Sequence, residues 1–404
     1  MRNTFSRDDS NSGLKESLIL ARSDSTPLTI LEQLAKDDDV EIRRAVAFNP
    51  NASKELLEQL SDEFPAEITQ NPIFSLFLLE KPEDPFILLA LARSPNTPPE
   101  TLEKLSKSTA RKVLVAICKN PNTSLEIIER ISQTTNKASI LIAICKNPDI
   151  PPEMLERISQ AISTTSVLTA ICRNPNISPE MLERLSYIKD SNVLFEICQR
   201  LELASETLDR VSRSINHNGI LSAICEHPNT STETLERLSR KRNVFFMRGL
   251  CSHQNTPTET LESLSQSTSS TYFLSLIAGN PNASPETLEG LSKRTDEKDV
   301  LTVICKNPNT PPETLERLSQ TTNAKILAAI YKNPNTSLKV RERYAWINNY
   351  KIKLKVCRDL NTSSKLLEQI AKTCRKNSKS ILFAIANNPN TPSYILEEIA
   401  NTLG

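Results

Sequence analysis

Glycine and histidine are scarce in this chain of 404 residues, which contains 6 Gly and 3 His. β-Sandwiches, β-barrels and glycine-rich phosphate loops need turns or close backbone contacts that glycine supplies most readily, so the sequence argues against all three. A zinc-protease HExxH sequence, a nucleophile elbow and a P-loop are also missing. The sequence therefore predicts a protein that is not an enzyme and that needs no cofactor or metal.

Charge of one sign and long hydrophobic runs are absent as well. The 49 basic and 48 acidic side chains give a net charge of +1, which exerts no general attraction on nucleic acid or anionic lipid. The longest apolar run, Phe86 to Ala92, is far shorter than the roughly 20 residues that cross a bilayer. We therefore expect no membrane partner.

The N-terminal residues are polar, and the nine cysteines are odd in number. No apolar core of signal-peptide length follows Met1, so these features favour a cytoplasmic location in which the thiols stay reduced. The stretch 1–13, MRNTFSRDDSNSG, predicts a disordered tail before a folded region at 14–404.

Proline, by contrast, is abundant and periodic. Anchor prolines within Asn-Pro-Asn or a close variant are Pro50, Pro95, Pro121, Pro148, Pro175, Pro228, Pro281, Pro308, Pro334 and Pro389. Equivalent positions without the full motif are Asp24, Pro72, Leu201, Gln254 and Leu360. These 15 anchors give a mean period near 26 residues, so almost the whole chain is one array of repeats.

Each repeat carries signals for two short helices. After the anchor, Thr310 suits the N-cap of a helix and Pro311 its first position, and Glu313, three residues after Thr310, completes a capping box. Leucines three residues apart then form an apolar stripe. A second apolar element, such as 300–305, ends at the next Asn-Pro because the residue before proline disfavours helix.

A single repeat has too little apolar surface to fold alone, so neighbours must stack on a shared core. The sequence thus predicts an all-α solenoid of about 15 two-helix repeats, with an irregular joint near 62–91 where the anchors are closer together. An alternative is that several Phe residues of this joint form an exposed apolar groove.

One stretch of the array resembles a known family. The segment from Asp39 to Asn51, DVEIRRAVAFNPN, followed by Leu56 to Leu60, LLEQL, is similar to the leucine-rich repeat variant family. That resemblance implies α-helices alternating with 3₁₀-helices in a right-handed superhelix without β-sheet. It implies no general chemistry.

Eight cysteines share one register, three residues before an anchor. They are Cys118, Cys145, Cys172, Cys198, Cys225, Cys251, Cys305 and Cys357. Alanine fills this position in other repeats, which predicts a small buried side chain. The alternative is a zinc site formed by Cys225, His227, Cys251 and His253. The simpler interpretation is that the two histidines replace the Asn of the motif.

Two rows of basic residues also follow the period. Arg130, Arg157, Arg184, Arg210, Arg237 and Arg317 each lie four residues after a Glu, which predicts a self-neutralised helix surface. The second row is Lys119, Lys146, Arg173, Lys306, Lys332 and Arg358. It is expected to complement the C-terminal ends of helix dipoles, with phosphate binding as the alternative.

The segment 339–358 departs from the repeat and contains the single Trp. Candidate partner-binding residues are Arg341, Arg343, Tyr344, Trp346, Tyr350, Lys351, Lys353 and Lys355. Basic residues interleaved with aromatics suit an acidic protein partner or nucleic acid, although an ordinary amphipathic helix is also consistent. We interpret the chain as a scaffold or adaptor that mediates protein–protein interaction. The alternative is an RNA- or DNA-binding solenoid whose affinity falls with salt.

Overall fold

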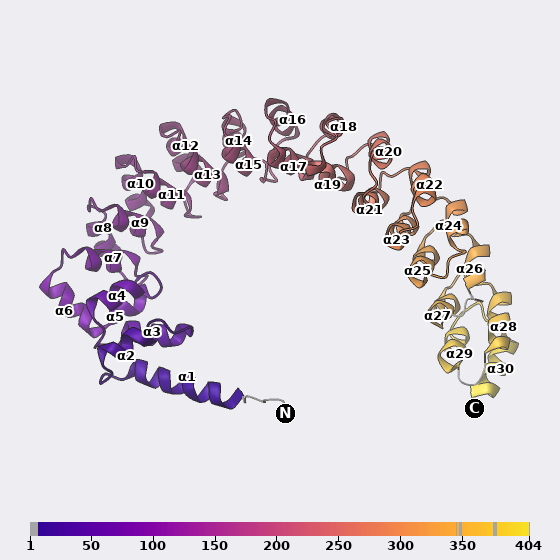
Figure 1. Ribbon diagram of the computed structural model, residues 1–404, viewed down its shortest axis with the longest axis horizontal. Coiled ribbons are helices and arrows are strands. Elements are labelled where there is room, and N and C mark those ends of the chain that lie inside the picture. The colour runs from indigo at the N-terminus through magenta and orange to yellow at the C-terminus, as the bar shows by residue number, and fades with distance from the viewer. Residues whose placement is uncertain (1–6, 345, 347–349, 375–377, 404) are drawn as a thin grey trace. The chain divides into compact units, whose positions relative to one another are not determined.

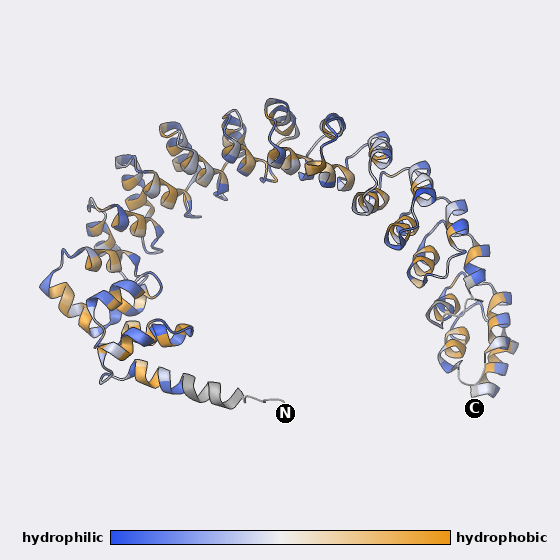
Figure 2. Ribbon diagram, viewed as in Figure 1, coloured by the Kyte–Doolittle hydropathy of each residue, from blue (hydrophilic) through white to orange (hydrophobic). Residues whose placement is uncertain are grey.

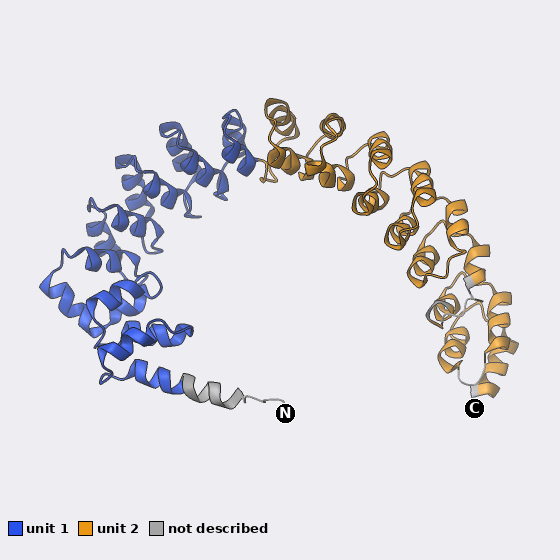
Figure 3. Ribbon diagram, viewed as in Figure 1, with its two compact units in different colours: residues 1–197 blue, residues 198–404 orange. Residues whose placement is uncertain are grey.

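The computed structural model describes residues 7–344, 346, 350–374 and 378–403, without the side chains of residues 7–14, 344, 351, 352 and 403. The described part of the chain forms 30 α-helices and no β-strand. The prediction of an all-α solenoid built from two-helix repeats is confirmed. The chain divides into two compact units, residues 1–197 and 198–404 (Figure 3).

Unit 1 contains the first 15 helices. They are α1 (Arg7–Arg22), α2 (Leu28–Leu34), α3 (Val40–Phe48), α4 (Lys54–Leu60), α5 (Pro65–Gln70), α6 (Pro72–Glu80), α7 (Pro85–Arg93), α8 (Pro99–Leu105), α9 (Arg111–Lys119), α10 (Leu125–Thr134), α11 (Ala138–Cys145), α12 (Pro152–Ala161), α13 (Thr165–Arg173), α14 (Pro179–Leu185) and α15 (Ser191–Ile197).

Unit 2 contains the other 15. They are α16 (Ser205–Ser214), α17 (Asn218–Glu226), α18 (Thr232–Ser239), α19 (Val244–Ser252), α20 (Thr258–Ser267), α21 (Thr271–Gly279), α22 (Pro285–Arg294), α23 (Lys298–Lys306), α24 (Pro312–Leu318), α25 (Ala324–Lys332), α26 (Leu338–Tyr344), α27 (Tyr350–Arg358), α28 (Ser364–Thr373), α29 (Lys379–Ala386) and α30 (Ser393–Leu403).

Within each unit the odd-numbered helices form one row and the even-numbered helices another (Figure 1). Most odd-numbered helices contact the next odd-numbered helix directly. Hydrophobic residues concentrate in this row (Figure 2), because an odd helix such as α23 is covered by its own pair partner and by a neighbour on each side. Even helices bury only a stripe, such as Leu315 and Leu318 of α24. Each fully buried leucine contributes about 2 kcal/mol.

The Asn-Pro-Asn-Thr turns join neighbouring repeats through side-chain hydrogen bonds. Asn307 Nδ2 donates to Ala278 O at 2.7 Å and to Asn280 O at 3.0 Å. The same pair of bonds to the preceding repeat is made by Asn49, Asn71, Asn120, Asn174, Asn280, Asn333 and Asn388. These buried amides pair carbonyls at the ends of odd helices, where no intrahelical donor is available.

The predicted capping boxes are wrong by one residue. Thr310 is fully buried, and its hydroxyl donates to Ile304 O at 2.5 Å in the preceding helix. Pro311, not Thr310, is the N-cap residue of α24. Where the next residue is serine it caps the helix, as Ser231 Oγ does by accepting from Thr234 N at 3.2 Å. The threonine therefore closes the turn, and the following residue starts the helix.

Two other expectations change, and a third stays untested. Helices of both rows are α-helices in the described part of the chain, where Ser378 alone has 3₁₀ conformation, so the alternation of α- with 3₁₀-helices implied by the family resemblance is not observed. Helix α1 begins at Arg7, inside the tail predicted for 1–13, whose first six residues lie outside the described residues. Right-handedness stays a prediction.

The region 62–91 is a shortened repeat. Asn71 is both the C-cap of the six-residue α5 and the N-cap of α6, so no turn separates these helices. Of the four phenylalanines, Phe64, Phe74 and Phe86 are buried, and Phe77 is half-buried against the same core. The rings of Phe74 and Phe86 pack edge to face with centroids 6.0 Å apart. The alternative of an exposed Phe groove is therefore wrong.

Candidate partner-binding surface

The two arginines of the predicted 339–358 site contact their own repeat array. Arg341 Nη2 donates to Asn333 O at 3.3 Å, and its Nη1 lies 3.9 Å from Asp359 Oδ2. Arg343 Nη1 donates to Ser319 Oγ at 3.3 Å. Burial raises the pKa of Asp359, but donors including Tyr331 OH and the charge of Arg341 outweigh this and lower it overall. Both arginines thus serve packing between repeats in this structure.

The exposed members of the site are fewer than the sequence indicated. Trp346 and Tyr350 are 51% and 52% exposed. Lys355 is exposed and Lys353 half-buried. The side chains of Tyr344 and Lys351 lie outside the described residues, as do residues 345 and 347–349. Of the eight candidate residues, Trp346, Tyr350 and Lys355 are therefore the exposed ones among those whose side chains are described.

Four arginines of the first row pair with the preceding repeat and not within their own helices as predicted. Arg130 Nη1 lies 2.9 Å from Glu103 Oε1 of the preceding repeat, and its Nη2 donates to Ser106 Oγ at 2.6 Å. Arg157, Arg184 and Arg237 likewise reach a carboxylate of the preceding repeat, at 3.2, 3.0 and 2.8 Å. These arginines therefore link neighbouring even helices, an interaction that one helix considered alone does not reveal.

The second basic row is exposed at the ends of odd helices, as expected. In unit 1 it comprises Lys119, Lys146 and Arg173, the last of which lies 2.5 Å from Glu196. In unit 2 it comprises Lys306, Lys332 and Arg358.

The cysteine register is buried, as predicted. All eight cysteines of the register are buried, and none of the chain's nine cysteines forms a disulfide. Burial raises the pKa of Cys118, Cys145, Cys225 and Cys251 to about 12, so these thiols are neutral and unreactive at physiological pH.

The two histidines in the turns replace asparagine. His227 Nε2 bonds to Arg200 O at 2.8 Å, and its Nδ1 accepts from Asn229 N at 3.1 Å. His253 repeats this arrangement, with Nε2 2.8 Å from His227 O and Nδ1 accepting from Asn255 N at 3.0 Å. Both ring nitrogens are occupied, so the zinc alternative is wrong. Among the described residues, no group of three or more potential metal ligands is found.

One surface was missed by the reading of the sequence. Phe245 and Tyr272 are each the second residue of an odd helix, α19 and α21, and are 67% and 53% exposed. Val244, the first residue of α19, is 62% exposed. We call Val244, Phe245 and Tyr272 the aromatic face. Aligning all repeats at this second helical position would have revealed it, because that position is otherwise Gly, Ser, Asn, Asp or Lys from α9 onward.

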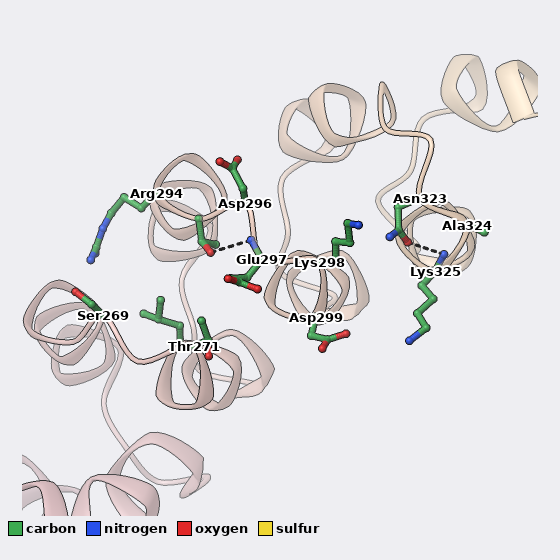
Figure 4. A pocket seen from close by; sticks show the side chains of 12 residues that line it. Ser269, Thr271, Arg294, Asp296, Glu297, Lys298, Asp299, Asn323, Ala324 and Lys325 are labelled. Atoms are coloured by element: carbon green, nitrogen blue, oxygen red, sulfur yellow. Dashed lines mark hydrogen bonds between the residues drawn. The ribbon is translucent and has the colours of Figure 1, made fainter.

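An open cavity of about 970 Å³ adjoins the aromatic face within unit 2. Its lining includes Thr271 beside Tyr272, the acidic residues Asp296 and Glu297, and the starts of α23 and α25. Figure 4 shows Asp299 and Lys325 projecting from the same side of their helices, with Lys298 on the opposite side of α23. The cavity wall therefore carries both charges.

Basic residues flank the other side of the aromatic face. Lys241 and Arg242 precede α19 and are exposed, and Lys241 Nζ donates to the neutral Asn216 Oδ1 at 3.3 Å. Arg248 lies one turn after Phe245 on the same face of α19, 4.0 Å from Glu226. The aromatic face thus lies between a basic border and a cavity of mixed charge.

No protein-family model and no curated protein is similar to this chain. An engineered protein solved by the Northeast Structural Genomics Consortium is 14% identical, with alignment of 81% of this chain and 93% of that one and a TM-score of 0.09. A designed armadillo repeat protein in complex with the peptide (KR)4 is 11% identical over 95% of each chain, also with a TM-score of 0.09. No described helix has the length and hydrophobicity of a membrane-spanning segment.

Proposed function

We propose that the protein is a non-enzymatic scaffold that binds another protein through the aromatic face of unit 2. The observation that carries this proposal is the register of Phe245 and Tyr272. They occupy an exposed position that is polar or glycine in the other repeats from α9 onward, and they do so on two helices in contact. Contiguous exposed apolar side chains mark interaction sites, and aromatic residues are enriched in protein interfaces.

The repeat itself offers a partner few free polar groups. The motif asparagines, threonines and arginines bond to neighbouring repeats, as Asn307, Thr310 and Arg130 do. Recognition must therefore use residues that vary between repeats. The exposed Trp346, Tyr350 and Lys355 form a second proposed contact surface, whereas Arg341 and Arg343 bond to neighbouring parts of the repeat array. A cytoplasmic location and membership of the leucine-rich repeat variant family stay part of this proposal.

Photo-crosslinking tests the proposal directly. Tyr272 is replaced by p-benzoylphenylalanine in the full chain, and the crosslinked products from cells of the source organism are identified by mass spectrometry. The matched control places the same amino acid at Ser380, which is the second residue of α29 and is also exposed. A protein crosslinked from position 272 and absent from position 380 is expected, and identical products from both positions would contradict the proposal.

Nucleic-acid binding is the second candidate. It is favoured by the exposed Lys119 and Lys146 at equivalent positions of neighbouring helices in unit 1. Fluorescence anisotropy with mixed-sequence single-stranded RNA and with duplex DNA at about 50 and 200 mM salt tests it, because phosphate contacts weaken steeply over this range. Binding that collapses at the higher salt and is lost in Lys119→Ser/Lys146→Ser would establish this candidate.

A further inference from the structure

We infer that the aromatic face binds an extended protein segment that is acidic and carries apolar side chains. This inference rests on the proposed function and specifies its partner. The face comprises Val244, Phe245 and Tyr272, all within unit 2 and all more than half exposed. Helices α19 and α21 are in contact, so Phe245 and Tyr272 lie one packed layer, roughly 8–10 Å, apart.

The basic border determines the charge of the partner. Lys241 and Arg242 lie exposed in the turn before α19, and Arg248 is exposed one turn after Phe245 on the same helix. Glu226 lies 4.0 Å from Arg248, and Asn216 is a neutral partner for Lys241, so positive charge remains in excess here. An acidic segment is attracted to such a border, and apolar side chains next to its carboxylates would contact the aromatic face.

The backbone at the border is strained and closely packed. Arg242 has a φ of 47°, a left-handed conformation that is unfavourable for a residue with a side chain. A Cβ on Gly249 would lie 2.7–2.8 Å from Cβ, C and O of Cys225, so α19 approaches α17 more closely than an alanine permits. The close contact at Gly249 fixes α19 against α17, and Val244 and Phe245 at the start of the same helix are exposed to solvent. An exposed apolar surface on a fixed helix is typical of a preorganised binding site.

The surface beyond Tyr272 favours a peptide over nucleic acid. The cavity lining carries Asp296, Glu297 and Asp299 together with Arg294, Lys298 and Lys325. Arg294 Nη1 already donates to Ser265 O at 2.8 Å. A chain of phosphates running past Tyr272 would meet these carboxylates, whereas a peptide can present different charges at its two ends. The odd helices α19 and α25 are three helix spacings apart, which makes a distance of up to about 30 Å between them. An extended segment of about nine residues spans this distance.

Peptide selection tests this inference on the full chain. A phage library of random nonapeptides is selected on the protein and counter-selected on Phe245→Ser/Tyr272→Ser. Serine occupies the same helical position at Ser139, Ser166 and Ser380, so this variant is expected to fold, which circular dichroism checks. Synthetic peptides with the selected sequence are then measured by fluorescence polarisation, beside charge-reversed versions and a nine-nucleotide oligouridine.

The selected peptides are expected to combine acidic with aromatic or aliphatic residues. Their affinity should fall about a hundred-fold in the double variant and about five-fold in Arg248→Ser. Serine occupies the position of Arg248 in both flanking helices, at Ser222 and Ser275, so this variant is expected to fold. Phe383→Ser removes an exposed aromatic of α29 away from the face and should change nothing. Affinity should also weaken between about 50 and 200 mM salt.

Three results would overturn the inference. Selection of basic or uncharged peptides that still need Phe245 and Tyr272 would refute the acidic partner and leave the proposed function standing. Oligouridine binding that is lost in the double variant would reassign the face to nucleic acid. Failure to enrich any peptide, together with no crosslink from position 272, would refute the proposed function as well.

Discussion

Two positions of the repeat in unit 2, the residue before each anchor and the second residue of each odd helix, follow different rules. At the first, Asn280, Asn307 and Asn333 are buried and each donates to two carbonyls of the preceding repeat. At the second, Phe245, Tyr272 and Asp299 are exposed and differ from repeat to repeat. A repeat therefore maintains its fold at the turn and can vary its surface at the start of the helix without structural consequence.

Breaking the turn should have the largest effect. In Asn307→Leu the carbonyls of Ala278 and Asn280 lose their side-chain donor, and a buried unpaired polar group costs about 1–3 kcal/mol. We expect the free energy of unfolding to fall by about 3 kcal/mol, measured by urea denaturation. Asn309 is half-buried, and its amide donates to Pro281 O and Ala283 O. Asn309→Ala should lower the free energy of unfolding by only about 1 kcal/mol, because water can replace the lost amide as donor. Equal effects of the two variants would contradict the role assigned to the buried position.

Placing a side chain in the tight contact between α17 and α19 should have the second largest effect on stability. Alanine occupies the position of Gly249 in most odd helices, for example at Ala116, Ala170 and Ala329. At Gly249 the added Cβ meets the backbone of Cys225, so Gly249→Ala should lower the free energy of unfolding by about 2 kcal/mol. Urea denaturation measures this change in the free energy of unfolding. Leu276→Ala is the control, because it places alanine at the same position of α21. Unchanged stability in Gly249→Ala would mean that α19 can move away from α17.

Removing the turn hydroxyl should have a smaller effect. Thr310 Oγ1 donates to Ile304 O, and Thr310→Val keeps the shape while leaving that carbonyl without this donor. We expect a loss of about 1 kcal/mol. Ala283 occupies the same position one repeat earlier, so Ala283→Thr should raise stability if the hydroxyl bond is formed there too.

The comparison also shows what the sequence could predict. The period, the helix pairs and the buried cysteine register followed from residues that recur in most repeats, and the interpretation of His227 as a replacement for asparagine is confirmed. The partners of Thr310 and Arg130 were misassigned because both lie in another helix or repeat, and helix rules consider neighbours within one helix. Tyr272 was missed because it breaks no local rule of helix formation. Its exposure becomes clear only when the packing is known.

Exchanging one turn residue for another should change little. His253 reaches one carbonyl of the preceding repeat, His227 O, where asparagines reach two. His253→Asn should therefore leave the free energy of unfolding unchanged or raise it by up to about 1 kcal/mol, whereas His253→Leu should lower it by about 2 kcal/mol. Urea denaturation distinguishes the two, and a large loss in His253→Asn would show that the imidazole has a role besides that of the motif amide.

The smallest structural effect is expected at the exposed position, and it is the sharpest test of the comparison. Phe245 and Tyr272 are mostly in water, so Phe245→Ser/Tyr272→Ser gives up little buried apolar area, and serine is accepted at this position elsewhere. The free energy of unfolding should change by no more than about 0.5 kcal/mol, within the range of ordinary surface substitutions. Hydrogen exchange of α19 and α21 should also be unaltered. A fall of several kcal/mol in the free energy of unfolding would mean that these rings stabilise the stack of repeats. The start of the helix would then maintain the fold, as the turn does.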